Sequence, residues 1–234
     1  MLFGTKRRLK SVNNFKIQCG DITVDRVDTV KYLGYMLDGN LSGNEQVSGC
    51  IKRIGARLSF LYRNAGALDF FTRKTLCNAL IQPHIDYCIA TWYNGILSCH
   101  RNRLNTLQRK MVRFIYSLDY RSHVGMSFFR ELGWLSVEDR AKYFRLLHVF
   151  RINAGTAPKY LMDGFSRVRQ IHRHNTRGSA TNFCVPKTNS TEILRRGFLY
   201  SAVTDWNALP GDLKQCTKEG IFKRKLRDHF ISLY

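Results

Sequence analysis

Apolar side chains recur every three or four residues through most of this sequence after residue 44. Val47, Ile51, Ile54, Leu58 and Leu61 follow one another at spacings of four, three, four and three. This spacing places all five side chains on one side of a helix, which can then bury that side against a partner. Similar patterns predict further helices from 69 towards Pro83 and over 101–118, 137–153, 194–208 and 218–233. The chain is therefore predicted to be mainly α.

Two of these helices carry a start signal. Asp69 is placed to accept a hydrogen bond from the first turn of its helix. Ser136 and Asp139 have the spacing of a capping box, in which each side chain bonds to the other residue's backbone.

Only the first 40 residues alternate as β-strands do. The segments 15–19 and 22–24 flank the turn residues Gly20 and Asp21, and 30–37 is predicted as a third strand. Residues 1–4 also read as part of a strand. The expected fold class is α+β, mainly helical with a small N-terminal antiparallel β element. We expect three parts: β structure over 1–40, a helical domain over 41–122 and a helical subdomain over 123–234, with a basic loop at 166–196.

Charge is unevenly distributed along the chain. The formal net charge is +21, with +5 over 98–122, +6 over 166–196 and zero over 67–97. Cations gathered on particular elements produce continuous positive surface, for which a polyanion is the natural partner. Nucleic acid fits such a surface best.

The helix at 101–118 has two distinct faces on a helical wheel. Its apolar residues fall within roughly 100° of arc, and its cations occupy the rest. These cations are Arg101, Arg103, Arg109, Lys110 and Arg113. The functional interpretation is phosphate binding without sequence preference; the alternative is a basic face that is only solvated.

Three tryptophans could in principle stack on bases, as aromatic side chains do on single strands. Trp92, Trp134 and Trp206 each lie within a strongly apolar segment. They are therefore predicted to anchor the core.

The sequence contains few candidate catalytic or metal-binding motifs. His172, His174 and Cys184 lack a fourth ligand and match no common spacing. Asp212 and Lys214 have the spacing of a nuclease motif, but they follow Pro210 and are better explained as a turn between helices. No metal site and no catalytic residue is predicted.

Seven cysteines occur without any regular spacing, so they are predicted to be reduced core thiols of an intracellular protein, in the nucleus, the cytoplasm or both. No apolar run is long enough to cross a bilayer, and no membrane partner is expected.

Several local strings, taken in order, resemble the C-terminal part of reverse transcriptases from non-LTR retrotransposons of the jockey and CR1 kind. MLFG (1–4) resembles the strand after the polymerase catalytic motif, and VKYLGYMLD (30–38) resembles the primer-grip hairpin. The thumb is resembled by LIQPHIDYC (80–88) and LQRKMVRFI (107–115), and the helical region after it by GWLSVEDR (133–140), PKYL (158–161), HNTR (174–177) and WNALP (206–210).

The resemblance implies an RNA-directed DNA polymerase parent whose catalytic aspartates, palm and fingers would precede residue 1. It implies that this chain alone is not an enzyme and holds no cofactor, since magnesium is expected only in the complete polymerase. The implied partners are RNA, DNA or an RNA–DNA hybrid, together with the missing palm and fingers.

Residue roles follow from the same resemblance. The hairpin containing Lys31, Tyr32, Leu33 and Gly34 would position the primer end, with Gly34 allowing close backbone approach. Thumb cations would follow the template-primer backbone, and Arg109, Lys110 and Arg113 are the candidates for that role. Arg173 and Arg177 would contact RNA or target DNA.

Two other interpretations remain open. The chain could be a nucleic-acid-binding protein that a host retains without any role in replication, or a protein-interaction scaffold whose basicity is incidental. The scaffold interpretation predicts no affinity for nucleic acid at physiological salt.

Overall fold

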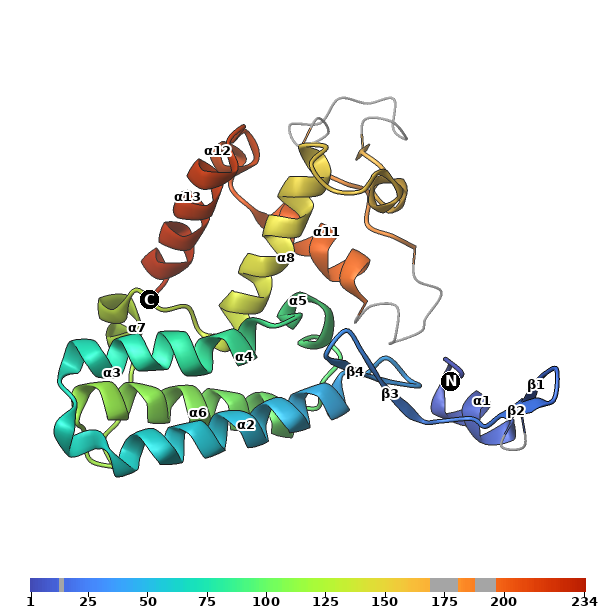
Figure 1. The fold of residues 1–234 in the computed structure, drawn as a ribbon. Coiled ribbons are helices and arrows are strands. Elements are labelled where there is room, and N and C mark those ends of the chain that lie inside the picture. The colour runs from blue at the N-terminus through green and yellow to red at the C-terminus, as the bar shows by residue number, and fades with distance from the viewer. Residues whose placement is uncertain (13–14, 169–180, 188–196) are drawn as a thin grey trace.

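A computed structural model describes residues 1–12, 15–168, 181–187 and 197–234. The chain is mainly helical, with two small antiparallel sheets near its N-terminus, as the sequence predicts. Figure 1 shows three parts: a lower layer of helices, an upper group of helices, and an N-terminal arm that extends to one side of the lower layer.

The lower layer is built from helices on either side of one apolar core. It contains α2 (Asn44–Arg63), α3 (Phe70–Leu76), α4 (Gln82–Asp86), α5 (Ile89–Trp92), α6 (Ser98–Tyr116) and α7 (Met126–Leu132). All five members of the α2 stripe are buried, which confirms the helical pattern predicted from 44 onwards. Burying such a stripe stabilises the layer because apolar area is removed from water.

The helix predicted from 69 begins where expected, since the Asp69 side chain accepts a hydrogen bond from the Thr72 amide at 2.8 Å. Instead of ending near Pro83, the helical path continues through a π-helical segment, Cys77–Ile81, into α4. Pro83 lies in the first turn of α4, where its missing N–H costs nothing.

The upper group is organised around α8 (Val137–Asn153), whose bounds match the predicted 137–153. It contacts α11 (Phe198–Ala208) and α13 (Glu219–Ser232), and a second core lies among them. The described residues also include the short elements α12 (Gly211–Lys214) and η3 (Lys159–Gly164). The first core extends as far as Ala141. Because α8 contributes to both cores, it joins the two groups of helices (Figure 1).

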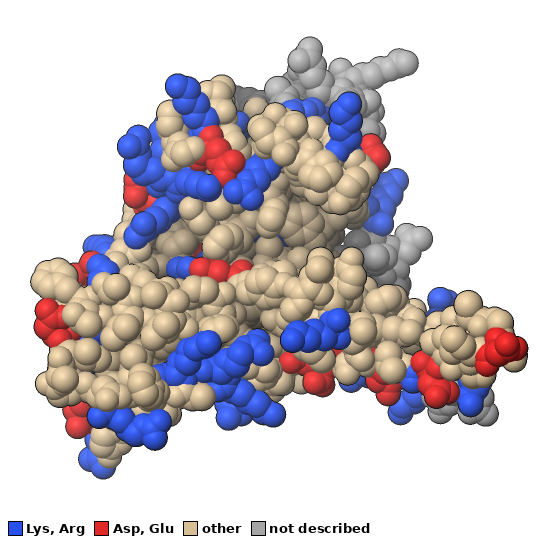
Figure 2. Space-filling model, in the orientation of Figure 1, with Lys and Arg blue, Asp and Glu red and all other residues tan. Residues whose placement is uncertain are grey.

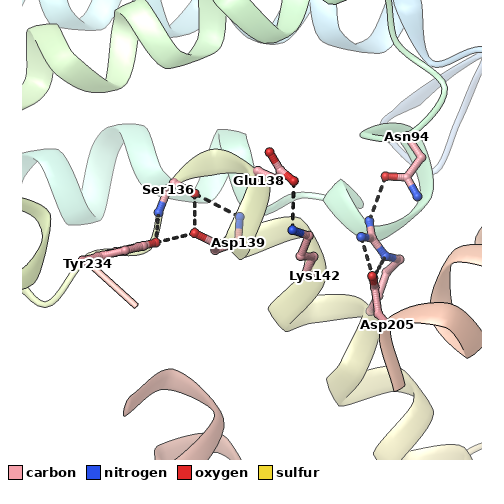
Figure 3. Close-up of polar contacts among 8 residues, drawn as sticks. Asn94, Ser136, Glu138, Asp139, Lys142, Asp205 and Tyr234 are labelled. Carbon is pink, nitrogen blue, oxygen red and sulfur yellow. Dashed lines mark hydrogen bonds and ion pairs between the residues drawn. The ribbon is translucent and has the colours of Figure 1, made fainter. Parts of the chain in front are cut away.

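Only half of the predicted capping box forms at the start of α8. The Ser136 hydroxyl accepts a hydrogen bond from the Asp139 amide at 3.1 Å, as predicted. The Ser136 amide, however, donates to the Tyr234 hydroxyl at 2.8 Å and not to Asp139. That hydroxyl in turn donates to the Asp139 carboxylate at 2.6 Å (Figure 3). A tertiary contact has therefore replaced one local bond.

The N-terminal arm differs from its prediction in three ways. Residues 1–4 form no strand, and a short helix, α1 (Lys6–Ser11), follows them. The strands β1 (Ile17–Cys19) and β2 (Ile22–Val24) pair as predicted. The single strand that the alternation predicts over 30–37 is instead a hairpin of β3 (Thr29–Tyr32) and β4 (Tyr35–Asp38), the shape that the resemblance implied for 30–38.

The arm joins the helical layer through a short polar link. The Asp38 carboxylate accepts hydrogen bonds from the amides of Asn40, Ser42 and Gly43 at 2.9–3.1 Å. Gly43 has a φ of +74°, and an added Cβ would lie 2.6 Å from the Cβ of Trp92. Only glycine fits this left-handed, crowded position, which fixes where α2 starts relative to the hairpin.

The prediction that particular residues lie in the core is confirmed for the tryptophans and only in part for the cysteines. Trp92, Trp134 and Trp206 are all buried, which confirms them as core anchors. All seven cysteines are free thiols, but only Cys50 and Cys77 are buried, whereas Cys19, Cys88 and Cys99 are exposed. The prediction that all seven are core thiols is therefore wrong for those three.

Candidate nucleic-acid interface

The exposed side of α6 carries part of the predicted basic face. Leu104, Met111 and their apolar neighbours are fully buried in the core, so the opposite side of the helix is left in solvent. Arg103, Arg109 and Lys110 are exposed there, and within the described ranges none of these side chains has a hydrogen bond or an ion pair. Their charges are therefore available to an external anion.

The other two cations of α6 are half-buried and held by the protein. Arg101 donates from Nη2 to the Asn94 carbonyl oxygen at 2.9 Å and lies over the ring of Tyr93. Arg113 donates from Nε to the Ser122 carbonyl oxygen at 2.9 Å. The expectation that all five cations extend freely into solvent is wrong for these two. Since carbonyl oxygens carry no net charge, both guanidiniums still contribute positive potential.

The structure adds cations on α2 that the sequence reasoning missed. The Leu97 amide donates to Asn44 Oδ1 at 3.1 Å, and the Tyr62 hydroxyl donates to the Lys110 carbonyl oxygen at 2.8 Å. The first bond joins the beginnings of α2 and α6, and the second joins the end of α2 to the second half of α6. The two helices therefore run parallel. Lys52 and Arg63 are exposed on α2. On a helical wheel both lie within about 40° of Ser59, which lines a groove beside α6, so they belong to the same surface. A helical wheel of 44–63, drawn as for α6, would have found them.

A groove of about 430 Å³ lies between these two helices. Leu58 and Leu107 lie among its apolar lining, and Lys110 and Arg113 line it with their cations. Tyr62 and the strongly exposed Tyr120 also line it. Aromatic rings beside cations suit a nucleic-acid strand because bases stack on the rings while phosphates meet the charges. Figure 2 shows one face of the lower layer, where Lys and Arg side chains gather over its middle.

The predicted primer-grip residues lie at the tip of the β3–β4 hairpin. Leu33 and Gly34 form its two-residue turn, with φ values of +47° and +83°. Two positive φ angles are the signature of a type I′ turn. Glycine adopts this conformation without steric cost, whereas leucine is strained in it. The Tyr87 hydroxyl donates a hydrogen bond to the Leu33 carbonyl oxygen and so ties the tip to the helical layer.

A larger groove, of about 800 Å³ and mostly apolar, lies beneath this tip. Tyr32 and Leu33 line it from the hairpin, Leu41 from the link to α2, and Leu97 from the residue before α6. The structure thus brings the hairpin tip to the beginning of α6. Lys31 is exposed on β3 and does not line this groove.

The remaining predicted contacts fall in or near the basic loop. Arg173 and Arg177 lie outside the described residues, as do His172 and His174. Arg167 lies over the ring of Phe183, and these two residues also pair as an isolated β-bridge. Asp212 and Lys214 fall within the short helix α12 between α11 and α13, in agreement with their interpretation as a connection.

The described residues contain neither of two further features, a metal-binding group and a membrane-spanning helix. Over these ranges, no three His, Cys, Asp or Glu side chains come together as a metal-binding group would require. None of the helices in the described part of the chain combines the length and apolarity needed to cross a membrane.

Comparison with known proteins finds no match: no family model, no curated protein and no solved structure corresponds to this chain.

Proposed function

We propose that this chain binds nucleic acid along the surface formed by α2 and α6. The observation that carries the proposal is a set of exposed cations without carboxylate partners in the described structure, arranged on two parallel helices: Lys52, Arg63, Arg103, Arg109 and Lys110. Each phosphate neutralised there would release condensed counterions, which is the main source of affinity for such surfaces.

The substrate that suits this surface best is a template-primer duplex, such as an RNA–DNA hybrid. The α2–α6 surface would follow the backbone, and the hairpin tip at Tyr32 and Leu33 would lie near the strand end. This assignment extends the resemblance of the chain to the C-terminal part of non-LTR retrotransposon reverse transcriptases. On that basis the chain is a binding part of such a polymerase and supplies no catalytic aspartates.

The experiment measures affinity for an RNA–DNA hybrid at several salt concentrations. A triple variant, Arg103→Gln, Arg109→Gln and Lys110→Gln, removes three phosphate contacts and should lower the slope of log affinity against log salt by about 2.7. The matched control, Lys218→Gln, Arg224→Gln and Lys225→Gln, removes the same charge from α13 and the residue that precedes it, and should leave the slope nearly unchanged.

Three outcomes would contradict the proposal. Equal slopes for the wild type and the α6 triple variant would show that this face is only solvated. Equal losses in both triple variants would show that binding follows total charge and not this surface. Absence of any binding at physiological salt would favour the protein-interaction scaffold instead.

A further inference from the structure

A second group of cations lies on the other flank of α2, away from α6. Cys50, Arg53 and Arg57 are spaced three and four residues apart, so they share one side of the helix. The Cys50 thiol donates a hydrogen bond to the His84 carbonyl oxygen at 3.0 Å, which shows that this side faces α4. Tyr62 lines the α2–α6 groove, and Arg57 lies about 140° away from it around the helix. The flank that carries Arg57 is therefore distinct from that groove.

Neither arginine on this flank has a carboxylate partner among the described residues. Arg57 Nη1 is buried and has no hydrogen-bond partner in the described structure. Arg53 folds back along the helix, with Nη1 3.3 Å from the position that a Gly49 Cβ would occupy. Among the residues that the structure describes, neither guanidinium is within ion-pair distance of a carboxylate. A buried guanidinium nitrogen without a partner is costly unless an acceptor comes from outside the chain.

The nearest acid on α4 is already engaged. Asp86 accepts from Arg140 Nε of α8 at 2.6 Å, in a two-bonded contact with the same guanidinium. It is therefore not available to Arg53 or Arg57. The Cys50 thiol is neutral at physiological pH because burial raises its pKa to about 11.

His84 completes the group from α4. Burial lowers the pKa of its imidazole, and the positive charges of Arg57 and Arg53 lower it further. The imidazole is therefore neutral at pH 7 and offers one N–H donor beside two guanidiniums. A bound anion would reverse the electrostatic effect of the arginines, because a nearby negative charge favours the imidazolium.

We propose that Arg53, Arg57 and His84 form a binding site for a single phosphate group between α2 and α4. Guanidinium groups bind phosphate oxygens through paired, charge-assisted hydrogen bonds, and an anion here would satisfy the unpartnered Arg57 nitrogen. The identity of the molecule that carries the phosphate rests on the proposed function, since a nucleic-acid backbone would bring phosphate groups to this protein. The site itself would bind a phosphate group from any source.

The test follows the His84 imidazole of the full 234-residue chain by NMR from pH 5 to 8. The probes are inorganic phosphate, a short single-stranded DNA, and the same DNA with a neutral methylphosphonate backbone. Phosphate and natural DNA should each raise the His84 pKa by about 1, and the neutral DNA should not. A response to inorganic phosphate alone would support the site and identify its ligand as a free anion.

Matched variants separate this site from the surface on α2 and α6. Arg57→Gln and Arg53→Gln should each remove the pKa increase, whereas Arg63→Gln, which removes the same charge from the exposed end of α2, should keep it. An unchanged His84 pKa in the folded wild type with both phosphate-bearing probes would overturn the proposal, as would an equal increase in all three variants. If the protein binds the hybrid tightly and with strong salt dependence while the His84 pKa stays unchanged, the phosphate site is contradicted and the proposed function is not.

Discussion

Arg145 of α8 and Asp205 of α11 form an ion pair in the upper group of helices, with Nη2 2.7 Å from Oδ2. The Arg145 side chain is only 3% exposed. Its Nε also donates to the same carboxylate oxygen at 2.8 Å, and its Nη1 donates to Asn94 Oδ1 at 3.2 Å (Figure 3). This one guanidinium therefore connects α8 and α11 to Asn94, which follows α5 in the lower layer.

Replacing Asp205 by Asn should destabilise the protein by about 3 kcal/mol, because it leaves the buried Arg145 charge without compensation. Urea unfolding would measure the loss. The control is Glu138→Gln, which removes the exposed i,i+4 pair with Lys142 and should cost about 0.5 kcal/mol or less. Equal effects of the two variants would show that the Arg145 contact contributes no more than a surface pair.

Trp206→Ala should lower the free energy of unfolding by about 3–5 kcal/mol. The indole is 1% exposed, and its Nε1 donates to the Thr181 carbonyl oxygen at 3.0 Å. Its removal would leave a large cavity beside Phe183 and Phe222. Denaturant unfolding measures the change, with the exposed Tyr160→Ala as a control expected within about 0.5 kcal/mol of the wild type. A small loss for Trp206→Ala would argue against a cooperatively folded upper core.

Leu33→Asn should stabilise the β3–β4 hairpin by about 1 kcal/mol, because asparagine tolerates the left-handed conformation that strains leucine. Leu33→Ala keeps that strain and should give no gain. Amide hydrogen exchange across β3 and β4 measures the local effect. Since the leucine side chain is 81% exposed, its loss removes little packing. Faster exchange in the Asn variant would contradict the assigned turn.

Glu219 should make stability depend on acid pH. Hydrogen bonds from Arg151 and Lys223 lower the pKa of this carboxyl to about 2 from its ordinary value of 4.5. Because the folded-state value is the lower one, this contribution is fully present above pH 4.5 and is lost as pH falls towards 2. Urea unfolding of the wild type and Glu219→Gln at several pH values checks it. The stability difference between them should shrink over that range, and a constant difference would contradict the prediction.

The helices could be predicted because the sequence patterns that specify them lie within a few turns of the chain. A stripe such as that of α2, or the Asp69 cap of α3, depends on residues within a few turns of one another. The bounds of α8 could be predicted because polar start signals flank a continuous apolar pattern. The third strand was mispredicted because Gly34 is the one turn-favouring residue in an otherwise strand-like segment, and the turn also depends on Leu33 adopting a positive φ that is rare for leucine.

The candidate surface was predictable only in part. The wheel identified the α6 cations, but it could not show that Arg101 and Arg113 turn towards carbonyl groups of other segments. Nor could it place α2 parallel to α6, or Arg53 and Arg57 opposite His84, because these pairings join residues far apart in the chain.

The sequence by itself determined that this protein is mainly helical, which faces of its helices are apolar, and that it carries a large positive charge. The tertiary structure alone decided which cations are free and which are held. The physical reason is that periodicity and charge belong to single segments, whereas the partner of a guanidinium is set by whichever distant carbonyl or carboxylate the packing of the helices brings beside it. Arg145 pairs with the Asp205 carboxylate, whereas Arg57 pairs with no carboxylate in the described structure.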